Sequence, residues 1–238
     1  MIYEDVSYGK ETEQKADIRV KEGAEKTVVY IHGGGLDSGD KRDAAAFLSA
    51  LQEAGYSVIS VNYRLYPQAV FPEYIKDCAA ALRFVSENAG KFGYAKNFAV
   101  IGSSAGAYIL SMLLFDEKYL SEYGVSRDDF AAFLIDSAQP TTHFRVLEER
   151  GIERNAIRID DASPLFFLKK CETFPKLTIV TYEEDMFCRK EQNTMFSKAL
   201  ESYGIRHNFC ILKGGHCAGE YPDENNEIRL LALLKDIF

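Results

Sequence analysis

The sequence has 238 residues, of which 47% are apolar and 27% are charged, a composition that supports one large hydrophobic core without a partner chain. Its net charge is −8 and it has no run of Lys or Arg, so binding to nucleic acid or to an anionic membrane is not expected. No segment offers about 20 uninterrupted apolar residues, which argues against a membrane-spanning helix.

The N-terminus and the cysteines give an expectation about location. The first 15 residues are charged from Glu4 onward and lack the apolar segment of a signal peptide, so we expect a cytoplasmic protein. The cysteines are odd in number and form no Cys-x-x-Cys pair, which predicts reduced thiols and no zinc ribbon. They are Cys78, Cys171, Cys188, Cys210 and Cys217.

Short apolar segments alternate with longer amphipathic segments along the chain, which predicts an α/β fold with a mostly parallel central sheet and helices on both faces. The expected strands, which are rich in β-branched and aromatic residues, are 26–32, 57–63, 97–102, 130–136, 177–182 and 206–212. Antiparallel edge strands are expected at 2–7 and 16–21. The expected helices are 42–54, 74–88, 105–115, 190–203 and 224–238.

Three glycines mark the expected ends of helices, and one segment of the chain follows neither the strand nor the helix pattern. Gly55, Gly90 and Gly204 follow three of the expected helices, where a left-handed cap favours glycine. Residues 137–168 fit neither the strand nor the helix period, and we interpret them as a small insertion over the site. We therefore expect a single domain over 1–238, with 137–168 as a minimal cap.

The strongest local motif is Gly-x-Ser-x-Gly at 102–106, between the expected strand 97–102 and the expected helix 105–115. A nucleophilic serine on such a turn has a strained backbone, and the flanking glycines let neighbouring segments pass closely. Ser104 is therefore the predicted nucleophile, whereas Ser103 holds the variable position of the motif. The alternative interpretation is a packing turn of small residues.

A second motif, His-Gly-Gly-Gly, follows the first core strand at 32–35. Backbone without side chains can bring N–H groups close to the oxyanion that forms during ester hydrolysis. The predicted oxyanion-hole donors are Gly33 and Gly34, together with Ala105 after the nucleophile. The alternative interpretation of this motif alone is a phosphate-binding nest or a plain turn, and His32 is expected to order the loop.

The general base is predicted to be His216, because it lies in a glycine-rich loop after the last expected strand. His207 lies within a strand pattern and His143 within the insertion, so both are expected to be surface or substrate-wall residues. Cys217, beside His216, is expected to be a small buried loop residue.

The acid that orients the histidine is predicted to be Asp185, which follows the expected strand 177–182. Glu183 and Glu184 are close rivals, and Asp136 at the end of an earlier strand is the second choice. The order serine, aspartate, histidine is that of an α/β-hydrolase.

The chain resembles the hormone-sensitive-lipase-like branch of the α/β-hydrolases, especially the small bacterial carboxylesterases and acetyl esterases. The resemblance covers nearly the whole chain and rests on HGGG at 32–35, the Tyr-Arg-Leu and Phe-Pro pattern within 62–85, GSSAG at 102–106 and ASPL at 162–165. Asp185 and His216 match the family's acid and base. Two departures affect the substrate range: a long N-terminal cap is missing, and Ala107 stands where a second glycine is frequent.

The resemblance implies a serine hydrolase with no metal and no organic cofactor, acting on a small-molecule ester. We expect short acyl groups, because the charged insertion is a poor lipid-facing lid, and an alcohol side open to groups such as sugars. The alternatives are an arylformamidase that cleaves an amide with the same residues and a catalytically inactive ligand receptor on the same scaffold. The sequence does not decide between a monomer and a homodimer.

Overall fold

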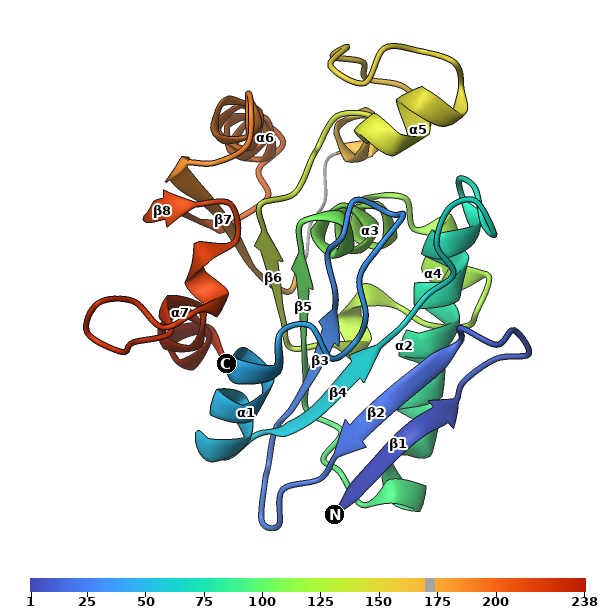
Figure 1. Cartoon of the computed structure of the whole chain (residues 1–238), viewed down its shortest axis with the longest axis vertical. Coiled ribbons are helices and arrows are strands. Elements are labelled where there is room, and N and C mark those ends of the chain that lie inside the picture. The colour runs from blue at the N-terminus through green and yellow to red at the C-terminus, as the bar shows by residue number, and fades with distance from the viewer. Residues whose placement is uncertain (170–173) are drawn as a thin grey trace.

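The computed structural model describes residues 1–169 and 174–238, so the expectation for Cys171 lies outside the described residues. The other four cysteines are free thiols. The described residues form one eight-stranded sheet in the order β1-β2-β4-β3-β5-β6-β7-β8 (Figure 1). The strands are β1 (Ile2–Ser7), β2 (Lys15–Arg19), β3 (Thr27–Ile31), β4 (Ser57–Val61), β5 (Phe98–Ser103), β6 (Ala132–Asp136), β7 (Lys176–Glu184) and β8 (Asn208–Gly215).

The sheet confirms the predicted α/β fold class. β1 pairs antiparallel with β2, and β2 pairs antiparallel with β4, whereas all pairs from β4 to β8 are parallel. The parallel register places Ile31 beside Gly102 and Ser103 beside Asp136. The carboxyl ends of β3, β5 and β6 therefore meet at one edge of the sheet, which is where ligands bind in open α/β sheets.

The helices confirm the five predicted segments and add short ones. They are α1 (Ala45–Glu53), α2 (Glu73–Phe92), α3 (Ala105–Phe115), α4 (Lys118–Ser121), α5 (Phe144–Glu149), α6 (Arg189–Ser202) and α7 (Arg229–Ile237), with single 3₁₀ turns η1 (Arg127–Asp129), η2 (Pro164–Phe167) and η3 (Ala218–Glu220). The prediction of a cap at Gly90 is wrong, because α2 continues to Phe92 and the left-handed cap is Gly93, with φ of 85°. Gly55 and Gly204 have φ of 100° and 76°, in the region predicted for them.

Helices cover both faces of the sheet because successive strand residues point to opposite sides. Val29 and Ile31 of β3 pack into the core that contains α2, α3 and α6. Val28 and Tyr30 of the same strand pack into the core that contains α1 and α7. Every residue of α3 is buried, which explains why its sequence is apolar on all sides.

Residues 137–168 form the irregular segment that contains α5 and η2. Figure 1 shows α5 beyond the carboxyl ends of β5 and β6, on the side where the predicted nucleophile lies. Its charged side chains are largely paired; Arg150, for example, lies 3.0 Å from both Asp160 and Asp161. Within the described residues, no helix is both long and apolar enough to cross a bilayer.

Candidate active site

Ser104 lies on the turn between β5 and α3, as the motif predicts. Its φ of 53° and ψ of −111° are uncommon for a residue with a side chain. The backbone N–H of Ser104 donates to the carbonyl of Asp136 over 2.8 Å, which ties the turn to the end of β6. The strained turn is thus held by the neighbouring strand.

Gly106 shows why the turn needs glycine. A Cβ atom at this position would lie 2.1 Å from the carbonyl oxygen of Ile31 at the end of β3. Only a residue without a side chain lets the first turn of α3 pack this closely against the neighbouring strand.

His216 and Asp185 complete a continuous set of hydrogen bonds with Ser104. Nε2 of His216 lies 2.7 Å from Oγ of Ser104, and Nδ1 lies 2.6 Å from Oδ1 of Asp185. The imidazole is 25% exposed, whereas the side chain of Asp185 is fully buried. The structure therefore brings the three predicted residues together from the ends of β5, β7 and β8.

Asp185 is held by donors that the sequence analysis did not single out. Its Oδ2 accepts hydrogen bonds from Oγ of Ser137 at 2.8 Å and from Oγ1 of Thr181 at 2.9 Å. Burial acts to raise the pKa of Asp185, but the bonds from His216 and Ser137 outweigh it and lower the pKa to about 2. Asp185 is therefore a carboxylate at any pH near neutrality.

The rival acids do not contact His216. Asp136 is fully buried and accepts a hydrogen bond from Oγ of Ser103 at 3.1 Å, while its Oδ1 has no partner among the described residues. Burial, and then the charge of Glu220, raise the pKa of Asp136 well above its ordinary value. Glu183 and Glu184 are exposed at the end of β7.

The other histidines also lie apart from Ser104. His143 is buried at the start of α5, where its ring accepts a hydrogen bond from the backbone of Arg145, so the expected surface or wall position is wrong for it. His207 contacts Oγ of Ser197 at 2.7 Å beside β8. His32 is buried and stacks on Tyr63 with ring centroids 4.4 Å apart, which fits a residue that orders the glycine loop.

The glycine loop passes directly beside Ser104. A Cβ atom at Gly33 would lie 3.1 Å from Cβ of Ser104, and Gly34 has φ of +103°. No described group accepts a hydrogen bond from the N–H of Gly33 or Gly34. Ala105 is the first residue of α3, where backbone N–H groups lack a partner within the helix. Gly33 and Gly34 line the same pocket as Ser104, and Ala105 directly follows it in the chain.

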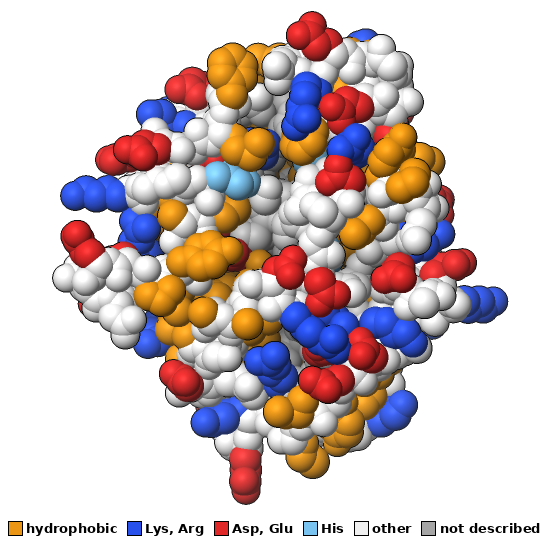
Figure 2. Space-filling view, viewed as in Figure 1, with side chains coloured by type: hydrophobic (Ala, Val, Ile, Leu, Met, Phe, Trp, Pro, Cys, Tyr) orange, Lys and Arg blue, Asp and Glu red, His pale blue; other side chains and the backbone are white. Residues whose placement is uncertain are grey.

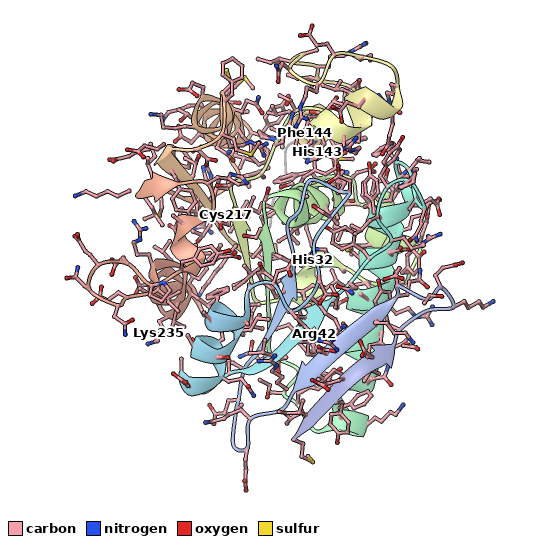
Figure 3. All side chains as sticks on the ribbon, in the orientation of Figure 1. His32, Arg42, His143, Phe144, Cys217 and Lys235 are labelled. Carbon is pink, nitrogen blue, oxygen red and sulfur yellow. The ribbon has the colours of Figure 1, made fainter. Side chains whose placement is uncertain are left out.

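A pocket of about 370 Å³ is lined by Ser104, His216 and the glycine loop. Figure 2 shows the face on which the molecule is hollowed near its centre, and Figure 3 places His32 and Cys217 on opposite sides of the strand ends. Cys217 is buried, as expected. The wall also includes residues that the sequence analysis did not foresee, namely Tyr30, Phe144, Met186, Glu220 and Tyr221. Glu220 accepts a hydrogen bond from the hydroxyl of Tyr30 at 2.7 Å.

A parallel sheet with a serine on its central strand turn defines the α/β-hydrolase class of proteins. Comparison with known families gives the same result: the model of the prolyl oligopeptidase family matches residues 72–235, and the BD-FAE model matches residues 17–121. The chain belongs to the prolyl oligopeptidase family of α/β-hydrolases.

Individual proteins are similar to this chain over different parts of its length. Carboxylesterase NlhH of Mycobacterium tuberculosis is 44% identical over 89 residues, which cover 36% of this chain and 28% of NlhH. Kynurenine formamidase of Danio rerio is 24% identical over 212 residues, which cover 86% of this chain and 71% of that protein. Esterase B of Lactobacillus rhamnosis shares the fold with a TM-score of 0.81 at 17% identity, covering 100% of this chain and 84% of the other.

Proposed function

We propose that the protein is a serine hydrolase that cleaves short-acyl carboxylic esters through an acyl-enzyme on Ser104. The observation that carries this proposal is the unbroken series of hydrogen bonds from Ser104 to His216 and on to Asp185, open to a pocket at the sheet edge. This arrangement is the one that activates a serine for attack on a carbonyl.

In the first half of the reaction, Oγ of Ser104 attacks the ester carbonyl while Nε2 of His216 takes the serine proton. Asp185 holds the proton on Nδ1 and stabilises the imidazolium that forms. The N–H groups of Gly33, Gly34 and Ala105 bind the oxyanion of the tetrahedral intermediate.

The second half releases both products. The ester bond breaks as His216 gives its proton to the leaving alcohol, which leaves the acyl group on Ser104. Water then attacks this acyl group and passes one proton to His216, and the intermediate collapses to the free acid and the restored serine.

Short acyl groups are favoured by the size of the site. A volume of about 370 Å³ is near the small end of the range for ligand pockets. In this proposal the protein is a single α/β-hydrolase domain, and residues 137–168 form only a minimal cap on it. Each methylene of the acyl chain that is not buried against an apolar wall loses about 0.8 kcal/mol of binding free energy. We expect kcat/KM for p-nitrophenyl esters to be highest from acetate to butyrate, and acetylated sugars to be accepted on the alcohol side. A maximum at octanoate or longer would contradict this.

A formamidase is the second candidate, because kynurenine formamidase aligns over most of the chain. The same residues would attack the formyl carbonyl and protonate an amine. The two candidates are separated by comparing kcat/KM for N-formylkynurenine with kcat/KM for p-nitrophenyl acetate. A formamidase should strongly prefer N-formylkynurenine, and an esterase should strongly prefer p-nitrophenyl acetate.

Covalent labelling tests the shared chemistry. A fluorophosphonate should label the wild type but not Ser104→Ala, and this substitution should lower kcat by at least about 10³-fold because it removes the nucleophile. Ser103→Ala is the matched control; it removes a hydroxyl bonded to Asp136 and should keep labelling. More than about a tenth of the wild-type kcat in Ser104→Ala would rule out Ser104 as the nucleophile.

A further inference from the structure

A second, smaller hollow of about 70 Å³ adjoins the active-site pocket. Phe144 and Met186 line both of them, so the hollow opens one residue beyond Asp185. Figure 3 shows Phe144 at the start of α5, on the side of the insertion that faces the strand ends. Polar side chains form much of its remaining wall; these are Gln139, Arg154, Asn155, Arg189 and Gln192.

Arg189 is the unusual member of this wall. It is only 4% exposed, and no described carboxylate lies within 4.0 Å of its guanidinium. Nη1 donates to the carbonyl of Ser137 at 2.9 Å and Nη2 to Oε1 of Gln139 at 3.4 Å, whereas Nε has no partner among the described residues. A buried cation without a paired anion is unfavourable and is normally compensated.

Arg189 nevertheless remains charged. Burial lowers its pKa to about 10, and the negative charge of Asp185 opposes that shift. The carboxylate of Asp185 is already engaged by His216, and Ser137 lies between the two residues, with its hydroxyl bonded to Asp185 and its carbonyl to Arg189. Asp185 therefore supplies a favourable field but no direct partner.

Arg154 adds a second cation at the mouth of the hollow. Its guanidinium lies 4.6 Å from the ring centroid of Phe144, and its nearest acid is Glu148 at 3.6 Å. No acidic side chain is among the residues that line the hollow. Among the described residues, the charged side chains that line the hollow are two arginines, which favours anions there in a protein of net charge −8.

We propose that this hollow binds a carboxylate of the substrate, so that the natural ester or formamide carries a carboxylate in addition to the bond that is cleaved. The inference rests on the proposed function, because it names the substrate class of the same site. A guanidinium binds a planar carboxylate with paired hydrogen bonds, and about 70 Å³ accommodates a group of this size.

Matched substrate pairs test the proposal on either side of the ester bond. For the acyl side, mono-p-nitrophenyl glutarate is compared with p-nitrophenyl pentanoate; for the alcohol side, 4-acetoxybenzoate is compared with its methyl ester. In the wild type, kcat/KM for the carboxylate member should exceed that for its neutral partner by about tenfold or more in one of the pairs.

Three variants locate the effect. Arg154→Gln and Arg189→Gln should each reduce the ratio of carboxylate to neutral kcat/KM severalfold, because each removes a cation of the hollow. Arg158→Gln is the matched control: it lies in the same insertion, is half-exposed beside Asp160 and does not line the hollow, so the ratio should stay at the wild-type value. Arg154 is 51% exposed, so its variant is informative even where Arg189→Gln does not fold.

The outcomes separate this inference from the proposed function. Ser104-dependent turnover of neutral esters with ratios at or below one in both pairs would overturn the carboxylate site alone. A preference that is unchanged in Arg154→Gln and in folded Arg189→Gln would also overturn it. Absence of Ser104-dependent turnover with every ester would overturn both.

Discussion

Asp136 ends β6 and Asp185 directly follows the neighbouring strand β7, yet their surroundings shift their pKa values in opposite directions. Both side chains are fully buried. Asp185 is surrounded by donors, from His216, Ser137, Thr181 and the N–H of Met186. Asp136 accepts a hydrogen bond from Ser103, interacts with the hydroxyl of Tyr182 and lies beside Glu220.

The comparison shows that the supply of donors, and not burial or position on the sheet, decides the direction in which each pKa is shifted. Burial alone acts to raise the pKa of both residues. Only at Asp185 do hydrogen bonds outweigh it and bring the pKa to about 2. Asp185, whose pKa is lowered, is therefore the residue suited to stabilise an imidazolium.

The largest expected effect is on kcat. Asp185→Asn should lower kcat by about 10²- to 10⁴-fold, because an amide cannot hold His216 in the required tautomer or stabilise its cation. Asp136→Asn should leave kcat within about threefold, because Asp136 is bonded to Ser103 and does not contact His216, and the amide has the same shape. Steady-state kinetics on a p-nitrophenyl ester measures both.

Two further variants complete this test. Glu183→Gln and Glu184→Gln remove exposed charges and should resemble the wild type. A damaging Asp136→Asn together with a mild Asp185→Asn would reverse the assignment of the acid and break the comparison.

The next effect is on the pH dependence of activity. His216 can accept the proton of Ser104 only as a neutral imidazole, and histidine ordinarily changes charge between pH 5 and 8. Asp185, with a pKa of about 2, stays ionised over that range. We therefore expect kcat/KM to rise with pH and to show no separate acid limb from Asp185. A flat profile would exclude His216 as the base, and a second acid limb would show that Asp185 titrates with it.

Much of the fold could be predicted because hydrophobic period and turn chemistry are local properties of the sequence. The strand 97–102, the motif at 102–106 and the apolar helix 105–115 define the turn at Ser104 without any long-range contact. The C-terminal end of α2 was predicted less accurately than this turn. Gly90 is tolerated within the helix, and the C-terminal cap is Gly93. Element boundaries depend on tertiary packing more than element types do.

The site residues that escaped prediction depend on contacts far apart in the chain. Ser137 and Asp185 are 48 residues apart, and no pattern in the sequence pairs them. Arg189 directly precedes the expected helix 190–203 and was not singled out, because its burial involves bonds to Ser137 and Gln139, about 50 residues away in the chain. The choice between Asp136 and Asp185 likewise required the position of His216, because both residues end a buried strand.

The smallest effect is on stability, and its sign differs between the two aspartates. Because folding lowers the pKa of Asp185, its carboxylate contributes stability that is present above about pH 4 and is lost as the pH falls toward about 2. Because folding raises the pKa of Asp136, the native protein disfavours its ionisation, and stability is lost as the pH rises above about 4.

These opposite pH dependences of the free energy of unfolding can be measured by urea unfolding between pH 2.5 and 7.5. The proteins compared are the wild type, Asp136→Asn and Asp185→Asn. As the pH rises, the free energy of unfolding of Asp136→Asn should increase relative to that of the wild type, because the amide has no proton to lose. That of Asp185→Asn should fall further below the wild type over the same range, because the variant lacks the carboxylate that the native donors stabilise. Differences on the order of 1 kcal/mol are expected. Parallel curves for the two variants would show that the native environments of the two carboxyl groups do not differ as the hydrogen bonds indicate.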